Sequence, residues 1–500
     1  MNNRMKGLTI VLMVSVLALA SCKGHRRDAD IRLPDSFTST GENPMPDKWW
    51  QEFGDPVLNE IVEQAMSGNL DVKSAWTRLD QARASMKASR AALFPSLSLG
   101  FKVSDTEYYG EEETPDTTSL FGGGGGGGLP TGGASSLASI QEGTFYTPSA
   151  TASYEVDLWG RYLSSKRAAD ANMEASEHDL FSMAMTMSAE VSRAWYTLVE
   201  KRRRMEILEE QEQVNENYLK LIEFRYNRGL VSAADVLQQR QQLSATQGEM
   251  SLVRMQIETF EHQLNLLLGR EPTATVNDGG TLAQLPPLPE TGVPAELLLR
   301  RPDVKSAQKR LEAADHRVAV AIADMFPTLS ITLSAQDTEE EFESLFDNWI
   351  RNIAINLVAP IFDAGRRKAE VERTKAASHE ALYNFEKTVL TAAREVEDAL
   401  TKERHQREYM ERLSDQLVSA RDALELSRQR YLNGSADYLR VLVNLQSVQS
   451  LEKRELEAER TLISYRIDLY RALGGGFELH REEPEEETIN PEKENKGGQK

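Results

Sequence analysis

The architecture of this chain is decided by residues 161–228, which read RYLSSKRAADANMEASEHDLFSMAMTMSAEVSRAWYTLVEKRRRMEILEEQEQVNENYLKLIEFRYNR. These sixty-eight residues contain neither proline nor glycine. Apolar side chains recur along one helical face at spacings of three and four: Leu180, Met183, Met187, Val191, Ala194 and Leu198. A helix of this length is a rod of roughly 100 Å, at about 1.5 Å per residue. Its apolar stripe must be buried against a partner.

The residues after this run predict a sharp turn and a returning helix. Gly229 can adopt the left-handed conformation that ends many helices. Ser232 and Asp235, three residues apart, can cap the start of the next helix. We therefore expect a long antiparallel helical hairpin.

The chain contains this hairpin twice, because its sequence repeats. The pentapeptide DVKSA occurs at 71–75 and again at 303–307, a shift of 303 − 71 = 232. The turn motif RYxxG occurs at 225–229 and at 430–434, a shift of 430 − 225 = 205. The second long helical run is 366–433. The matches keep the same order in both halves, which indicates a tandem duplication.

The two shifts differ by 232 − 205 = 27, which locates an insertion in the first copy, within residues 95–160. Seven consecutive glycines at 122–128 lie in this interval and indicate a flexible loop. The tail at 477–500 is acidic, and its composition predicts disorder. The predicted organisation is a signal peptide (1–21), a lipid-anchored segment (22–54), repeat one (55–270), a linker (271–293), repeat two (294–476) and the tail (477–500).

Four segments alternate between apolar and polar residues: 96–104 and 150–158 in the first copy, 328–335 and 353–361 in the second. Such alternation gives a strand one apolar and one wet face, as in any amphipathic hairpin over a core. Lengths near nine residues also fit transmembrane strands. Four strands cannot close a membrane barrel, which needs about eight. Two chains would supply 8 strands and three would supply 12.

The N-terminus predicts export and lipid attachment. Arg4 and Lys6 precede an apolar stretch, Leu8 to Leu19, that is too short to span a bilayer and fits a signal peptide. It leads into Leu-Ala-Ser-Cys, a lipobox ending at Cys22, the only cysteine of the chain. We expect the mature protein to start at a lipidated Cys22, outside the cytoplasm. Lys23 weakly favours the outer membrane.

Composition excludes several classes of protein. The net charge of −20 argues against nucleic-acid binding, which needs a basic face. A single cysteine excludes an intramolecular disulfide and a cysteine-based zinc site. The seven histidines form no HExxH motif, and no Ser/His/Asp or paired-carboxylate constellation stands out. We expect no enzyme activity, no cofactor and no metal site.

These features together resemble the TolC-type outer-membrane efflux protein family, in its lipoprotein branch. The matching motifs run from about Trp49 to Gly475 and include Trp50-x-x-Phe53-x-Asp55-Pro56-x-Leu58, Asn69-Leu70-Asp71, Phe94-Pro95, Phe326-Pro327, Asp157-Leu158-Trp159-Gly160-Arg161, Phe362-Asp363-Ala364-Gly365-Arg366 and both RYxxG turns. The resemblance implies a mainly α-helical protein with a membrane β part.

The resemblance further implies a homotrimer, in which a 12-stranded outer-membrane β-barrel continues into a 12-helix periplasmic α-barrel. It implies a passive conduit in outer-membrane lipid that docks on a periplasmic adaptor and an inner-membrane pump of the resistance-nodulation-division class. Drugs, detergents or metal ions would leave the periplasm through it. A type I protein-secretion channel shares the fold and is the alternative.

The gate is also inferred from the resemblance. In the family the periplasmic end is narrowed just after the second helix-turn, with an apolar residue at +5 from the turn glycine and often an acid at +9. Here these positions hold Leu439 and Val443, with Asp437 the nearest acid. The alternative for Leu439 and Val443 is a buried helix stripe. The tips of the two turns should face the adaptor with polar side chains free to pair with it: Arg225, Tyr226, Gly229, Arg430, Tyr431 and Gly434.

Overall fold

The computed structural model of this protein describes residues 34–107, 143–277, 279–292, 294, 300–475 and 479. The predicted signal peptide, Cys22, the glycine run and nearly all of the tail lie outside these residues. The chain divides into two compact units, each described here by itself. One contains the strands, within 87–166 and 317–374, and the other is helical.

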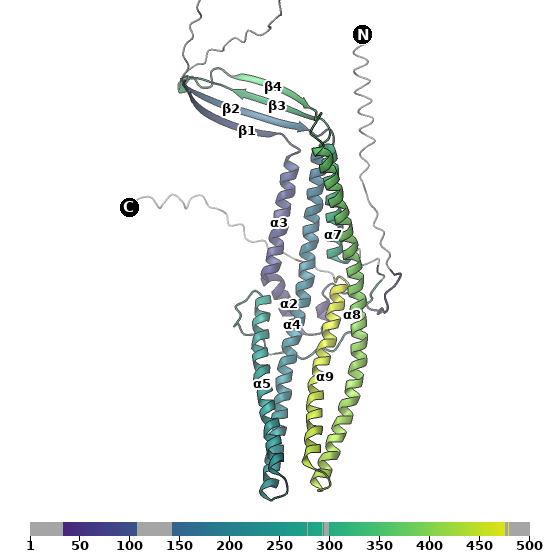
Figure 1. Ribbon diagram of the computed structural model, residues 1–500. Helices are drawn as coiled ribbons and strands as arrows, with labels where there is room; N and C mark the ends of the chain where they lie inside the picture. Colours follow the sequence, from purple (N-terminus) through teal and green to yellow (C-terminus); the bar gives the residue numbers. More distant parts are fainter. Residues whose placement is uncertain are drawn as a thin grey trace, which may run out of the picture. The chain divides into compact units, whose positions relative to one another are not determined.

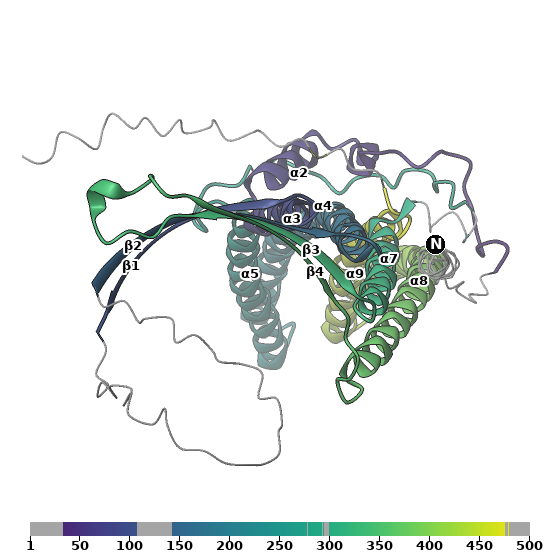
Figure 2. The ribbon, with the colours of Figure 1, turned by 90° about the horizontal axis from the view of Figure 1, so that it is seen from above.

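The first unit is built on one antiparallel sheet of four strands in the order β1-β2-β3-β4 (Figure 1). They span Ser96–Thr106 (β1), Gly143–Val156 (β2), Thr328–Gln336 (β3) and Ile350–Val358 (β4). Figure 2 shows that the strands are curved. Leu97 pairs with Ala152, which pairs with Leu333 and then Ile353. Residues opposite one another share a face of the sheet, so the predicted alternation produces one apolar face.

The second strand of each hairpin ends earlier than the sequence predicts. Leu158, Ala359 and Ile361 were expected in strands, but β2 ends at Val156 and β4 at Val358. At the end of β2, the carboxylate of Asp157 accepts a bond from the Leu163 amide in the next helix (2.8 Å), which turns the chain. After β4, Pro360 has no N–H for a ladder hydrogen bond.

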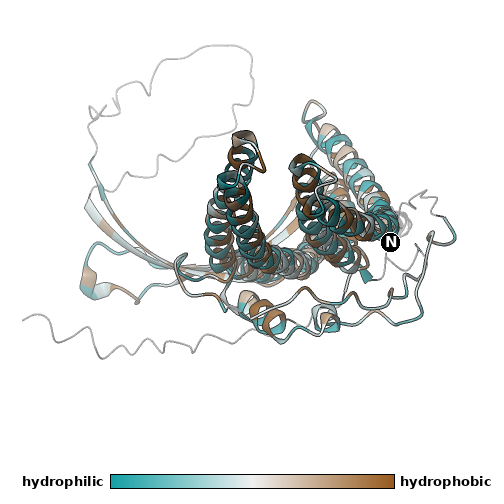
Figure 3. Cartoon of the chain, turned by 90° about the horizontal axis from the view of Figure 1, so that it is seen from below, coloured by the Kyte–Doolittle hydropathy of each residue, from teal (hydrophilic) through white to brown (hydrophobic). Residues whose placement is uncertain are grey.

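The helices follow the predicted order in both halves. The first half contains α2 (Pro56–Gly68), α3 (Leu70–Ala91), α4 (Arg161–Asn227) and α5 (Ala233–Leu267); the second contains α7 (Pro302–Ala323), α8 (Arg366–Leu432) and α9 (Tyr438–Ala472). Two short 3-10 helices are η1 (Trp49–Phe53) and η3 (Phe342–Ser344). Hydrophilic and hydrophobic residues both run along the long helices (Figure 3). Among the described residues, none of the helices is apolar over enough of its length to cross a bilayer.

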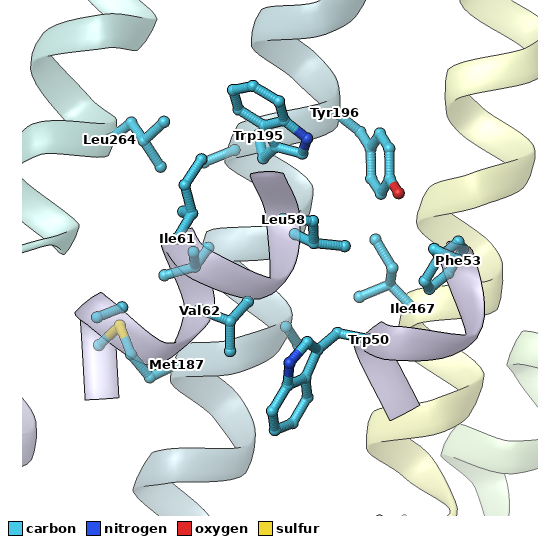
Figure 4. Close-up of a cluster of buried hydrophobic side chains, with 14 of the residues drawn as sticks. Trp50, Phe53, Leu58, Ile61, Val62, Met187, Trp195, Tyr196, Leu264 and Ile467 are labelled. Atoms are coloured by element: carbon cyan, nitrogen blue, oxygen red, sulfur yellow. The ribbon is translucent and has the colours of Figure 1, made fainter. Parts of the chain in front are cut away.

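The helical unit has an aromatic core that includes the segment before α2 (Figure 4). Trp49 is fully buried and stacks on Tyr470, with ring centroids 5.5 Å apart. Asp55 links this segment to α4: one oxygen accepts the amides of Val57 and Leu58, and the other accepts the Trp195 indole N–H (2.8 Å). The carboxylate therefore caps α2 and also fixes that helix against α4.

A buried ion pair ties the linker between the repeats to the helices. The guanidinium of Arg466, fully buried in α9, donates two bonds to the Glu403 carboxylate of α8, at 2.9 and 2.7 Å. It also donates to the carbonyls of Pro286 and Pro287. Burial raises the pKa of Glu403, but the hydrogen bonds and charge of Arg466 and Arg407 outweigh it, so its pKa lies below the ordinary value.

We predict that Glu403→Gln destabilises the helical unit by about 3–5 kcal/mol, because it leaves a buried guanidinium without its counter-charge. Since the pKa of Glu403 is lowered on folding, its stabilisation is present above the unfolded value of 4.5 and is lost as the pH falls through the folded value. Denaturation midpoints from circular dichroism, measured between pH 3 and pH 7, test both statements. Asp415→Asn, at an exposed ion pair with Arg412, is the control and should not shift the midpoint. An unchanged Glu403→Gln midpoint would contradict the prediction.

Candidate functional site

The two helix-turns of the hairpins are closed by the same hydrogen bonds. At the first, the amide of Leu230 bonds to the Arg225 carbonyl (3.0 Å); at the second, the amide of Ser435 bonds to the Arg430 carbonyl (2.9 Å). Such a bond needs a left-handed residue just before the donor. Gly229 and Gly434 supply it, with φ of 72° and 74°. This geometry explains the glycine of both RYxxG motifs.

Each returning helix is capped by a side chain. Ser232 and Asp235 form the predicted reciprocal capping pair at the start of α5, which is confirmed. At the start of α9 the carboxylate of Asp437 accepts a bond from the Arg440 amide (3.2 Å). Asp437 is exposed, but its carboxylate is engaged as the helix cap.

The tip residues differ in how accessible they are. Tyr226 and Arg430 are exposed. Tyr431 is 4% exposed and lies in an apolar cluster with Ile222 and Val441, so it differs from the expectation that all tip side chains are free. The guanidinium of Arg225 lies 4.4 Å from the centroid of the Tyr431 ring, a cation–π contact. Arg225 and Tyr431 therefore join the first hairpin to the second instead of facing outward.

Behind the tips, the two hairpins meet through amide side chains. Gln239 of α5 is fully buried; its oxygen accepts the Tyr438 hydroxyl (2.6 Å) and its nitrogen donates to the Asn215 carbonyl (2.8 Å). Further along, Gln211 donates to the Gln449 carbonyl (3.1 Å), and the side chain of Gln449 donates to Asn215 (3.4 Å). No local motif in the sequence indicates this network, because its members are up to 238 residues apart.

The predicted gate residues lie on the open face of α9. Leu439 is 48% exposed and Val443 is 54% exposed. The buried stripe of the same helix is made of other residues: Tyr438, Val441, Leu442, Leu445 and Val448. The buried-stripe interpretation of Leu439 and Val443 is therefore wrong for the single chain. These two large apolar side chains, four residues apart, share a face that the described part of the chain leaves about half exposed.

The described residues contain no group of three or more His, Cys, Asp or Glu side chains placed to hold a metal ion. The feature that distinguishes this region is the way in which the two helical hairpins end and are joined. Two helical hairpins end in matched turns, join through polar contacts, and expose an apolar face near one turn.

The fold defines the class of protein to which the chain belongs. It matches the outer-membrane channel OprN with a TM-score of 0.78 and 27% identity, covering 91% of this chain and 99% of that chain. It matches CusC with a TM-score of 0.76 and 22% identity, which supports the fold alone. The architecture is that of the TolC-like outer-membrane channels.

The sequence then fixes the family. The model of the outer membrane efflux protein family matches residues 61–270 and 293–475, so this chain belongs to that family. The pyoverdine export outer membrane protein OpmQ of Pseudomonas aeruginosa is 28% identical over 96% of this chain and 98% of its own length. The toluene efflux pump outer membrane protein TtgF of Pseudomonas putida is 28% identical, over 87% of each chain. The protein is thus a channel component of an efflux system in the outer membrane, as the resemblance implied.

We predict that Gln239→Leu loosens the hairpin tips. It leaves the Tyr438 hydroxyl buried without its partner, at a cost of about 1–3 kcal/mol, and removes a second bond to the Asn215 carbonyl, which still accepts within α4. Hydrogen exchange of the first turns of α9 should therefore speed up. Gln241→Leu, the same change at an exposed position of the same helix, is the matched control. Adding Tyr438→Phe to Gln239→Leu should recover part of the protection, and a lack of recovery would contradict this pairing.

Proposed function

We propose that this chain is one protomer of a trimeric outer-membrane channel that passively conducts small molecules from the periplasm to the exterior. The exposure of the sheet's apolar face is the observation that supports this most directly. Leu99 is 82% exposed, Ile353 71% and Ile355 68%. Burying such side chains in hydrocarbon contributes about 25 cal/mol per Å² of apolar surface removed from water.

The open edges of the sheet support assembly into a trimer. Among the described residues, the order β1-β2-β3-β4 leaves the outer sides of β1 and β4 without a strand partner. In lipid each unsatisfied backbone group costs several kcal/mol, so β1 of one copy must pair with β4 of the next. Three copies give a closed barrel of 12 strands, and α4, α5, α8 and α9 of each copy give a barrel of 12 helices.

Within this assembly we propose that repeat one (55–270) and repeat two (294–476) each supply one β-hairpin and one helical hairpin. The linker at 271–293 joins them. The exposed tip residues Tyr226 and Arg430 would contact a periplasmic adaptor, together with the glycine turns at Gly229 and Gly434. A resistance-nodulation-division pump in the inner membrane would supply the energy.

The gate would be formed by Leu439 and Val443. Around a threefold axis each would form an apolar ring, and such rings can bar ions by dewetting. Asp437 is the weaker candidate, because its carboxylate is occupied as the cap of α9. Arg225 and Tyr431 would hold the second hairpin beside the first while the gate is closed.

The cargo is proposed from the names of the relatives. By their names, these relatives serve the export of pyoverdine and the efflux of toluene. We therefore propose small organic molecules as the cargo. A protein-secretion partner remains the alternative outcome when the inner-membrane component is identified by crosslinking and co-purification.

We predict that Leu439→Ser together with Val443→Ser raises the resting conductance of the channel in planar bilayers, because two polar rings no longer exclude water and ions. Cells carrying the variant should also become sensitive to vancomycin. The matched control is Leu237→Ser on α5, where a leucine of 63% exposure follows the first turn. A rise with Leu237→Ser alone would place the constriction on the first hairpin. A preparation that forms no channel would contradict the proposed function itself.

Cys22 is proposed as the site of lipid attachment, on the strength of the lipobox alone. Radiolabelled palmitate should mark the wild-type chain and not Cys22→Ser, because the thiol is the acceptor of the acylated group. Ser21→Ala, which keeps the cysteine, is the control. Equal labelling of Cys22→Ser would exclude the anchor, without bearing on the channel.

A further inference from the structure

The strand register puts a basic side chain on the apolar face of the sheet. Leu99 pairs with Ala150, Ala150 with Ala335, and Ala335 with Arg351. Residues that face one another across neighbouring strands point to the same side of a sheet. The next row along contains only apolar residues: Leu97, Ala152, Leu333 and Ile353. Arg351, which is exposed, therefore lies at the edge of the apolar face.

Arg351 lies at the end of the sheet that is farther from the helices along the chain. Both strand hairpins begin and end at helices, so the β3–β4 loop lies at the opposite end of the sheet. In a channel with periplasmic helices, that end faces the exterior. Arg351 is the second residue of β4 after this loop. It thus belongs to the outer-leaflet side of the proposed barrel.

The distance from Arg351 to the other end of the sheet, where the strands join the helices, matches the height of a membrane. There, Trp159 stacks on Phe326 with ring centroids 4.8 Å apart, just before β3. From Phe326 to Ala335, the partner of Arg351, is 335 − 326 = 9 residues, or about 30 Å along a strand. A strand tilt of about 40° reduces this to about 23 Å, close to the apolar band of roughly 25 Å in outer-membrane barrels. Arg351 then lies at the level of the outer headgroups.

Aromatic side chains gather at the same end. Phe101 stacks on Tyr146 (6.5 Å between centroids), and Tyr146 meets Phe342 edge-on (5.8 Å). Trp349, two residues before Arg351, lies 5.9 Å from Phe346. Aromatic residues of this kind are enriched where a membrane protein crosses the lipid–water interface.

The acids nearest to Arg351 in register are already engaged by the loop. Asp337 is 1% exposed, and its carboxylate accepts the amides of Phe346 (2.8 Å) and Asn348 (3.4 Å). Glu339 accepts the side-chain amide of Asn348 (2.8 Å). Asp337 also holds Phe346 in a left-handed conformation, with φ of 82°, which is uncommon for a bulky residue. Two of the six acids at 337–347, Asp337 and Glu339, therefore bond to groups of the loop itself and not to the guanidinium.

We propose that Arg351, flanked by Trp349, binds the phosphate of a phosphorylated lipid in the outer leaflet. A guanidinium offers two parallel N–H donors to a phosphate, which an ammonium cannot. A lipid is the fitting source of the phosphate, because the side chain lies on the face that meets acyl chains and at the height of the headgroups. This inference rests on the proposed function, since it needs the sheet to be in the membrane.

The test uses the full chain, purified in detergent as the assembled channel, with diphosphoryl lipid A as the probe. Its Kd should be at least tenfold lower than that of the dephosphorylated lipid, and Arg351→Gln should abolish most of this difference. Arg351→Lys should restore it in part. The matched control is Lys102→Gln, which removes one positive charge near the same end but from the opposite face of the sheet. It should leave the Kd unchanged.

Three results would overturn the inference. One is equal affinity of the wild type for the two lipids, a measurement that does not depend on whether any variant folds. Another is an unchanged Kd in Arg351→Gln. The third is displacement of the lipid by millimolar inorganic phosphate, which would indicate a site for soluble anions. Conductance of the same wild-type preparation separates the two claims: a channel without lipid discrimination refutes this site alone, whereas a preparation without conductance refutes the proposed function.

Discussion

The backbone groups along the outer sides of β1 and β4 impose the constraint on which the rest of this structure depends. A strand edge in water can bond to solvent, but an edge in lipid cannot. The same four strands expose leucine and isoleucine side chains, so water is a poor solvent for them. One chain alone cannot both place its apolar side chains in lipid and pair the backbone groups along the outer sides of β1 and β4. In the proposed assembly, pairing of β1 with β4 of another copy would do so, and each copy would add its two β-hairpins to the ring.

How much of this was predictable depends on the range of the interactions involved. The ends of α4 and α8 follow from local chemistry, since Gly229 and Gly434 set the turn. All four strands were located by their alternation, but β2 and β4 begin earlier than predicted, at Gly143 and Ile350, and also end earlier, at the side of the helices. At these ends the side chain of Asp157 and the missing N–H of Pro360 decide where the strand hydrogen bonds stop. The alternation of apolar and polar residues contains no information about either effect.

At the candidate gate, long-range contacts limit what can be predicted from the sequence. The spacing of Leu439 and Val443 was visible in the sequence, but α9 has apolar residues on two faces, and only packing shows that Tyr438 and Val441 are the covered ones. Tyr431 illustrates the reverse case. Its place in a polar turn motif suggested exposure, but the guanidinium of Arg225, which lies 431 − 225 = 206 residues earlier, covers the ring instead.

The two kinds of contact within the helical unit explain where it can move. Around Trp49 and Trp195 the contacts are dry and apolar, and separating them would expose large aromatic surfaces to water. Toward the hairpin tips the apolar cluster is smaller and the contacts include amides such as Gln239 and Gln449, whose bonds can be exchanged for bonds to water at small net cost once the groups are hydrated. Local opening is therefore cheaper at the tips than at the aromatic core. The proposed channel would have to stay assembled while its gate opens, and this order of stabilities would permit that.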